Sequence, residues 1–144
     1  MKKLLMLIAI ASGIIVGIDH AHWFSVQAAE ANQNSDELLT EAFKTHRSDF
    51  QIQVQASVLK LLPDDVNGSK HQRFIVSLNS GHTLLVTHNL DLAPRIDNLK
   101  EGDSIEFSGE YEWNKKGGVI HWTHHDPQSR HVGGWIRHGA QLYQ

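Results

Sequence analysis

A strict alternation of apolar and polar side chains from Phe50 to Val58 constrains this chain more than any other feature of its sequence. Apolar residues occupy the even positions of this segment, and glutamine or serine occupies the odd positions between them. Because side chains of a β-strand point alternately to opposite faces, the segment has one buried face and one wet face. It predicts a strand in the wall of a β-structure.

Four more segments carry strand signals. Residues 74–78 and 83–87 are apolar runs joined by the hairpin sequence Asn-Ser-Gly, residues 104–113 alternate after a Gly-Asp turn, and residues 119–123 follow a second glycine-containing loop. Residues 89–99 contain Pro94 and predict a short connector, and Gly109 predicts a bend or bulge inside the fourth strand. The pattern predicts an all-β fold with one short helix, specifically a small five-stranded OB-type barrel, although another small barrel or a two-sheet sandwich has the same signals.

The N-terminal residues have the three-part pattern of a secretory signal peptide. Basic residues precede an uncharged apolar run from Leu4 to Ile18, and small residues end at Ala28 and Ala29. We therefore expect residues 1–28 to be a signal peptide cleaved after Ala28, with an uncleaved anchor as the alternative, and a periplasmic or secreted location. In either case the membrane is a partner only through this N-terminal segment.

Residues 29–48 predict a lead-in followed by a short amphipathic helix. Ser35 is the expected N-cap, and Asp36 and Glu37 place negative charge in the first turn, where a helix N-terminus favours it. Residues 49–144 then form the barrel and a C-terminal segment rich in histidine and tryptophan. The chain has no cysteine, so neither a disulfide nor a thiolate contributes to stability or chemistry.

Charge is distributed unevenly along the chain, whose net charge is −3. Residues 29–113 hold seven basic and fourteen acidic residues, whereas residues 114–144 hold four basic residues and one acidic residue. A basic, histidine-rich tail on an acidic body predicts that the tail is a working face. The acidic body disfavours nucleic acid as a partner, because binding a polyanion needs a basic groove.

The sequence His-Trp-Thr-His-His-Asp-Pro from His121 to Pro127 is the unusual stretch. Imidazole and carboxylate are the usual ligands of zinc when thiolate is absent, so a turn after the last strand would let a divalent metal such as Zn²⁺ bind. The candidate metal ligands are His124, His125, Asp126 and His131. The spacing matches no known metal signature, and the same residues would equally hydrogen-bond one another across the end of the barrel.

A ligand-contacting surface is the other interpretation of this segment. Aromatic rings and polar side chains among glycines are suited to stacking on a ligand, and loops carry function more often than strands do. The candidate ligand-binding residues are Trp122, His125, Arg130 and Trp135. Catalysis without a metal is less favoured, because the chain lacks a Gly-x-Ser-x-Gly nucleophile motif.

Several strings of residues resemble the bacterial family of unknown function DUF3465. They are Leu-Pro-Asp-Asp at 62–65, His-Gln-Arg-Phe at 71–74, His-Asn-Leu-Asp-Leu-Ala-Pro at 88–94, Gly-Glu-Tyr-Glu-Trp at 109–113, Gly-Gly-Val-Ile-His-Trp-Thr-His-His-Asp-Pro at 117–127 and Gly-Trp-Ile at 134–136. The resemblance extends from about Phe50 to Tyr143. It implies a small exported protein and supplies no catalytic residues to carry over.

These observations favour an uncharacterised exported OB-like domain that serves as a ligand-binding or interaction module through its C-terminal segment. The partner would be an unknown ligand or an envelope protein. The alternative is a metal-dependent hydrolase, a nuclease or phosphoesterase, with a His/Asp site. A structural protein of the envelope is the third possibility.

Overall fold

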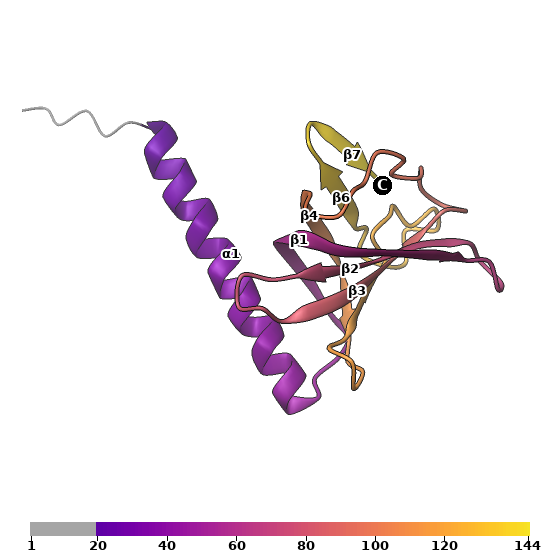
Figure 1. Cartoon of the computed structure of the whole chain (residues 1–144), viewed down its shortest axis with the longest axis horizontal. Helices are drawn as coiled ribbons and strands as arrows, with labels where there is room; N and C mark the ends of the chain where they lie inside the picture. Colours follow the sequence, from indigo (N-terminus) through magenta and orange to yellow (C-terminus); the bar gives the residue numbers. More distant parts are fainter. Residues whose placement is uncertain (1–19) are drawn as a thin grey trace, which may run out of the picture.

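The computed structural model describes residues 20–144 as one helix followed by seven strands. The long helix lies along one side of a strongly curved sheet (Figure 1). The elements are α1 (His20–Thr45), β1 (Phe50–Asp65), β2 (His71–Ser77), β3 (Thr83–Asn89), β4 (Ser104–Glu112), β5 (Val119–His121), β6 (Trp135–His138) and β7 (Gln141–Tyr143).

Five of the strands close into a ring. Their order is β1-β2-β3-β5-β4, and β4 pairs back with β1. The short β3–β5 pair is parallel, whereas the other pairs in the ring are antiparallel. β1 closes the ring because its first half pairs with β4 and its second half pairs with β2. The predicted small five-stranded β-barrel with an N-terminal helix is confirmed.

The barrel interior is filled by the alternate apolar side chains that the sequence predicts. Phe74, Phe107 and Tyr111 are fully buried, as expected for large aromatic residues on the inward faces of β2 and β4. The connector between β3 and β4 covers one end of the barrel with Ile96, whose backbone exchanges two hydrogen bonds of 3.0 Å with the buried amide of Gln72. This exchange satisfies a polar side chain inside the core.

The helix differs from the prediction. α1 is already helical at His20, so Ser35 lies inside it and is not an N-cap. Alanine-rich sequence before Ser35 favours continuation of the helix, which overrides the local capping signal. Asp36 accepts hydrogen bonds from the backbone amide (2.8 Å) and hydroxyl of Ser80. The carboxylate therefore ties α1 to the β2–β3 turn.

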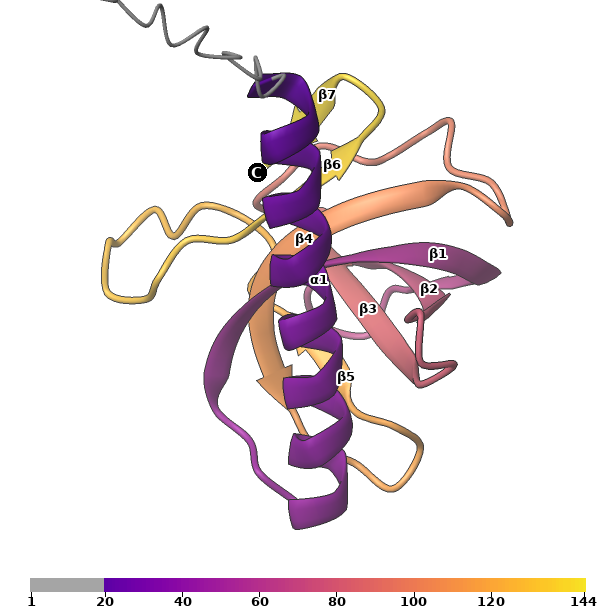
Figure 2. The same cartoon turned by 90° about the vertical axis from the view of Figure 1, so that its left-hand side faces the viewer.

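Only the second half of α1 packs on the barrel. Leu39 and Ala42 enter the core, whereas residues 21–31 are exposed, including Trp23 at 53% and Phe24 at 66%. Figure 2 shows the helix crossing in front of the barrel, with its N-terminal end beyond the sheet. Among the described residues, no helix combines the length and apolar character that crossing a membrane requires. The first nineteen residues of the predicted signal peptide lie outside the described part of the chain, and cleavage after Ala28 remains a prediction.

Three further details of the strands differ from the expectations. Gly109 makes no bulge against β1, since β1 and β4 stay in register past it; a Cβ there would lie 2.6 Å from the carbonyl oxygen of His121. Glycine is therefore needed for the close approach of β5. The fifth strand ends at His121 rather than at Thr123, and the strands β6 and β7 were not predicted.

Candidate functional site

The C-terminal segment leaves the barrel at Trp122, directly after β5. Trp122 has a φ of 55°, a left-handed conformation that turns the chain out of the strand. The loop returns at Gly134, whose amide donates a 2.9 Å hydrogen bond to the carbonyl of His124. A Cβ on Gly134 would lie 1.9 Å from the carbonyl oxygen of Trp122, so only glycine permits the two ends of the loop to meet.

Asp126 organises the interior of this loop. Its carboxylate accepts hydrogen bonds from the backbone amides of Gln128 (3.0 Å), Arg130 (2.8 Å) and His131 (2.8 Å). The bonds from Gln128 and His131, which favour the charged form most, hold the pKa of Asp126 below its ordinary value. The carboxylate is thus used to fold the loop.

His131 joins the loop to the barrel wall. Its Nε2 lies 2.6 Å from a carboxylate oxygen of Glu110 on β4, and its Nδ1 lies 2.7 Å from the carbonyl oxygen of Val132. Both neighbours only accept hydrogen bonds, so the imidazolium, which donates from both nitrogens, fits this position. The ring also stacks on Trp122, with centroids 4.0 Å apart and planes 9° from parallel. Burial opposes the charge, but these hydrogen bonds outweigh it and raise the pKa of His131.

His121 on β5 faces the carboxylate of Glu110 and also that of Glu112. Its Nε2 lies 3.5 Å from Glu110 and 3.6 Å from Glu112, in ion-pair range if the ring is protonated. That nitrogen is buried and has no hydrogen-bond partner within residues 20–144. The β4–β5 register sets this arrangement, because Glu110 pairs directly with His121.

His88 on β3 lies behind the loop, fully buried. Its Nε2 is 3.1 Å from the carbonyl oxygen of Pro94 and its Nδ1 is 2.8 Å from the hydroxyl of Thr123. A carbonyl must accept and a hydroxyl is able to donate, so the neutral ring satisfies both positions. Burial above all, together with the nearby rings of His124 and His71, lowers the pKa of His88 to about 4.

A depression of about 220 Å³ lies where β2, β3 and the C-terminal segment meet. We call it the histidine pocket; it is lined by His71, Thr87, Asn89, Leu92, His121, Trp122 and His124. The Nδ1 atoms of His71 and His124 each lie 2.8 Å from a backbone carbonyl oxygen, to which they must donate. In the neutral rings the Nε2 atoms of these two residues are therefore hydrogen-bond acceptors.

The structure brings together only some of the residues that the sequence singled out. The ring of Trp122 contacts the rings of His131 and His124, with centroid separations of 4.0 Å and 5.3 Å. His125 and Arg130 are exposed on the loop. Trp135 lies apart from them on β6, where the guanidinium of Arg137 is 5.3 Å above its ring.

The candidate metal ligands do not converge. Asp126 is occupied by backbone amides, His131 by Glu110, and the Nδ1 of His124 by the carbonyl of His125. Within residues 20–144, no three histidine, aspartate or glutamate side chains form a group that would hold a metal ion. The metal site remains a prediction that the arrangement of these residues does not support.

Two residues that form or support the candidate site were not predicted from the sequence. His71 and Glu110 lie far from the C-terminal segment along the chain, and strand pairing brings them to it. The only local signal was their place on outward faces of strands. Glu110 lies among the partly exposed residues of β4, where it binds His131.

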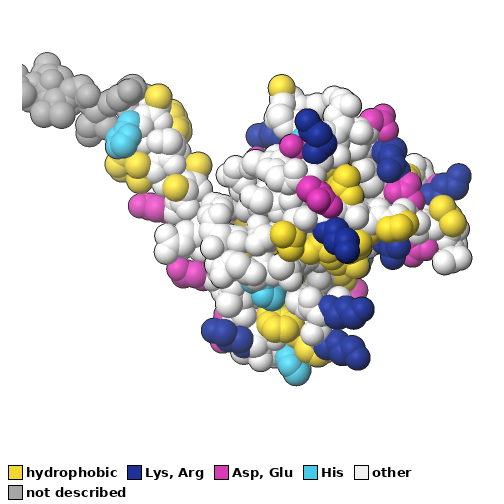
Figure 3. All heavy atoms as spheres, in the orientation of Figure 1, with side chains coloured by type: hydrophobic (Ala, Val, Ile, Leu, Met, Phe, Trp, Pro, Cys, Tyr) yellow, Lys and Arg dark blue, Asp and Glu magenta, His cyan; other side chains and the backbone are white. Residues whose placement is uncertain are grey.

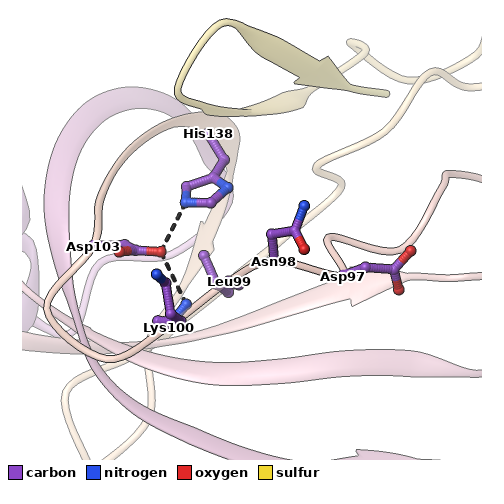
Figure 4. A pocket seen from close by; sticks show the side chains of 6 residues that line it. All are labelled: Asp97, Asn98, Leu99, Lys100, Asp103 and His138. Atoms are coloured by element: carbon purple, nitrogen blue, oxygen red, sulfur yellow. Dashed lines mark hydrogen bonds and ion pairs between the residues drawn. The ribbon is translucent and has the colours of Figure 1, made fainter.

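Another depression, of about 500 Å³, lies between the connector and β6 (Figure 4). Its central carboxylate, Asp103, accepts hydrogen bonds from the Lys100 amide at 2.9 Å and from Nε2 of His138 at 2.8 Å. The bond from Lys100, followed by His138, lowers the pKa of Asp103. The Asp103 and His138 side chains of this depression bind each other, and the depression is a weaker candidate than the histidine pocket.

Comparison with known proteins gives a family and no activity. The family described as "Protein of unknown function (DUF3465)" matches residues 22–144, which cover most of the chain. No curated protein is significantly similar to the chain. The resemblance found in the sequence is confirmed over a longer range than the strings that first indicated it.

Proposed function

Since the chain belongs to the DUF3465 family, whose description assigns no activity, we propose from its geometry that it is a ligand-binding module of OB type. Its binding site is the histidine pocket, which is formed by three separate parts of the chain. That convergence is the observation that carries the proposal, because most ligand sites are concave surfaces with a few polar groups directed at one place. The predicted signal peptide supports a location of the module outside the cytoplasmic membrane as part of this proposal.

The strand order supports the OB assignment and the position of the site. Barrels of this type bind ligands on the face of their second and third strands, and the histidine pocket uses His71 from β2 with Thr87 and Asn89 from β3. This argument is an analogy between folds, so the lining residues carry the functional part of the proposal.

The lining chemistry indicates the class of ligand. Two imidazole nitrogens are able to accept hydrogen bonds, and Trp122 supplies an aromatic surface. The Thr87 hydroxyl donates to the carbonyl of Ile120 and is still able to accept, and the Asn89 oxygen accepts from the amide of Asp91 while its NH₂ group is able to donate. A neutral molecule that carries hydroxyl or amide groups on a compact body matches this set. The volume of about 220 Å³ admits a ligand of roughly seven water-sized groups at ~30 Å³ each.

Nuclear magnetic resonance with a panel of small polyols and amides tests the proposal. We expect backbone amide shifts to change at Thr87, Asn89 and His124, and His71→Ala to weaken binding about tenfold, through loss of one hydrogen bond and its packing. His138→Ala is the matched control, since its imidazole lies in the other depression. Shifts confined to the His138 depression, or binding that His71→Ala leaves unchanged, would contradict the assignment. A Zn²⁺ titration in the same experiment tests the hydrolase alternative.

A further inference from the structure

A second pocket lies on the outer face of β2 and β3, and it has a different lining. Its volume is about 240 Å³, and its walls include the aliphatic side chains of Leu62, Ile75 and Leu85. Strand pairing aligns Ile75 with Leu85 across β2 and β3, and Leu62 with Arg73 across β1 and β2. The floor is therefore continuous over three strands, and we call this depression the cationic pocket.

Two cations border the floor. Arg73 and Lys116 line the pocket, and its lining contains no carboxylate. Within residues 20–144, the ion pairs of lysine and arginine involve Arg95 and Arg137, so neither bordering cation has a carboxylate partner. Arg73 is fixed by a 3.0 Å hydrogen bond from its Nε to the carbonyl of Pro63. Its two terminal nitrogens have no carboxylate to neutralise them.

The loop that carries Lys116 is rigidly held. Asn114 accepts hydrogen bonds from the amides of Lys116 (2.8 Å) and Gly118 (3.2 Å) through one side-chain oxygen. The carbonyl of Gly117 lies 2.8 Å from Nε2 of His82. A Cβ on Gly118 would lie 2.2 Å from the ring of Tyr111, so the loop is pressed against the barrel. The pocket is thus preorganised on this side.

Unpaired cations beside an aliphatic floor are unexpected on a chain whose net charge is −3. Figure 3 shows hydrophobic side chains, with lysine and arginine beside them, gathered over the part of the barrel formed by β1, β2 and β3. A ligand that complements the charge of this pocket carries an anionic group, and a ligand that covers the aliphatic floor has an apolar body.

The shape of the apolar part is also constrained. Proteins that bind nucleobases stack them on aromatic rings, whereas no aromatic residue lines this pocket. Its volume is that of about eight water-sized groups at ~30 Å³ each. We propose that the cationic pocket binds a medium-chain aliphatic carboxylate, with the chain on Leu62, Ile75 and Leu85 and the carboxylate between Arg73 and Lys116.

Calorimetric titration with octanoate tests this proposal, with 1-octanol and octylammonium as the neutral and positively charged probes. We expect octanoate to bind, 1-octanol to bind at least tenfold more weakly, and octylammonium not to bind. Arg73→Gln and Lys116→Gln should each raise the Kd for octanoate about tenfold, and circular dichroism should show that both variants are folded. Lys115→Gln is the matched control, because Lys115 is in the same loop and does not line the pocket.

Equal affinity for octanoate and 1-octanol would overturn the proposal, and so would an unchanged Kd for octanoate in the Arg73→Gln/Lys116→Gln double variant. A third contradicting result is that octanoate changes the chemical shifts of residues away from Ile75 and Leu85 in resonance spectra. Binding of oligothymidylate at these residues in place of octanoate would assign the pocket to nucleic acid instead. His71→Ala should leave octanoate binding unchanged. Failure of the histidine pocket and failure of the cationic pocket are therefore separate outcomes.

Discussion

The histidine pocket and the cationic pocket lie on the same two strands and differ in the chemistry of their lining. Two successive outward residues of β2 line the two pockets, His71 the histidine pocket and Arg73 the cationic pocket. The histidine pocket is bordered by imidazole, hydroxyl and amide groups that form hydrogen bonds, whereas the cationic pocket is bordered by the cations of Arg73 and Lys116. One face of the barrel thus contains a region suited to a neutral hydrogen-bonding ligand beside a region suited to an anion.

The supports of the two regions differ as well. The loop of the histidine pocket is organised by the carboxylate of Asp126 and anchored by the His131–Glu110 contact. The loop of the cationic pocket is held by glycines that permit close contact with the barrel. Substitution of an ionisable side chain therefore tests the first region, and substitution of a glycine tests the second.

The largest expected effect is on the cationic pocket. Gly118→Ala places a methyl group 2.2 Å from Tyr111 at a φ of 106°, so overpacking and backbone strain together should lower the free energy of unfolding by about 4 kcal/mol. Urea denaturation measures it. Gly81→Ala is the control, because its φ of 84° brings similar strain with no atom within 4 Å of the new methyl group; we expect a loss of about 1 to 2 kcal/mol. Equal losses would show that the close contact with Tyr111 is not important.

Acid should destabilise the region of the histidine pocket through His88. Because the pKa of His88 is lowered to about 4 in the folded protein and is ~6.5 when unfolded, its stabilising contribution is present above pH 6.5 and is lost as the pH falls toward 4. The free energy of unfolding should decrease by about 3 kcal/mol over this range from this residue. Urea denaturation at pH 7 and pH 4 measures the change.

His88→Gln provides the control for that measurement. Glutamine is able to donate to the carbonyl of Pro94 and accept from Thr123, and it does not titrate. The variant should therefore lose about 3 kcal/mol less than the unaltered protein between pH 7 and pH 4. The same pH dependence in both proteins would show that His88 is not the group responsible.

The smallest effect concerns the anchor of the loop. The pKa of His131 is raised, so its contact with Glu110 stabilises the fold at low pH and is lost as the pH rises through the folded pKa. Glu110→Gln should lower the titration midpoint of His131 in a resonance titration and cost about 1 kcal/mol or less in stability. Glu112→Gln should leave the midpoint in place, because Glu112 faces His121. A midpoint of His131 that Glu110→Gln does not lower would remove Glu110 as the cause.

The barrel could be predicted from the sequence because its strands have local signals. The alternation of β1 and the turn between β2 and β3 depend on residues next to one another, and both were placed correctly. β6 and β7 have only four and three residues, too few for alternation to be visible. The predicted start of α1 was wrong because a serine inside an alanine-rich helix has the same local sequence signal as a serine that caps the helix N-terminus.

The candidate site was predicted in part for a similar reason. Trp122 and His124 could be recognised because the unusual composition of the C-terminal segment is local. His71 and Glu110 could not, since they reach that segment through the pairing of β5 with β3 and β4. Sequence alone does not fix which strands of a barrel become neighbours, so the part of the histidine pocket that β2 and β3 contribute could not be predicted.

The closure of the ring also determines how a newly made chain acquires its structure. The β2–β3 hairpin forms from adjacent residues, but the first half of β1 has no strand partner until β4 has been made and has paired with it. Until then β1 presents an unpaired edge, which is the feature that promotes misassociation of incomplete β-proteins. Distant pairing of this kind also slows folding. The helix that precedes the barrel is available from the outset, and its Asn32 accepts a 2.6 Å hydrogen bond from the backbone amide of Gln55, which occupies one polar group of β1.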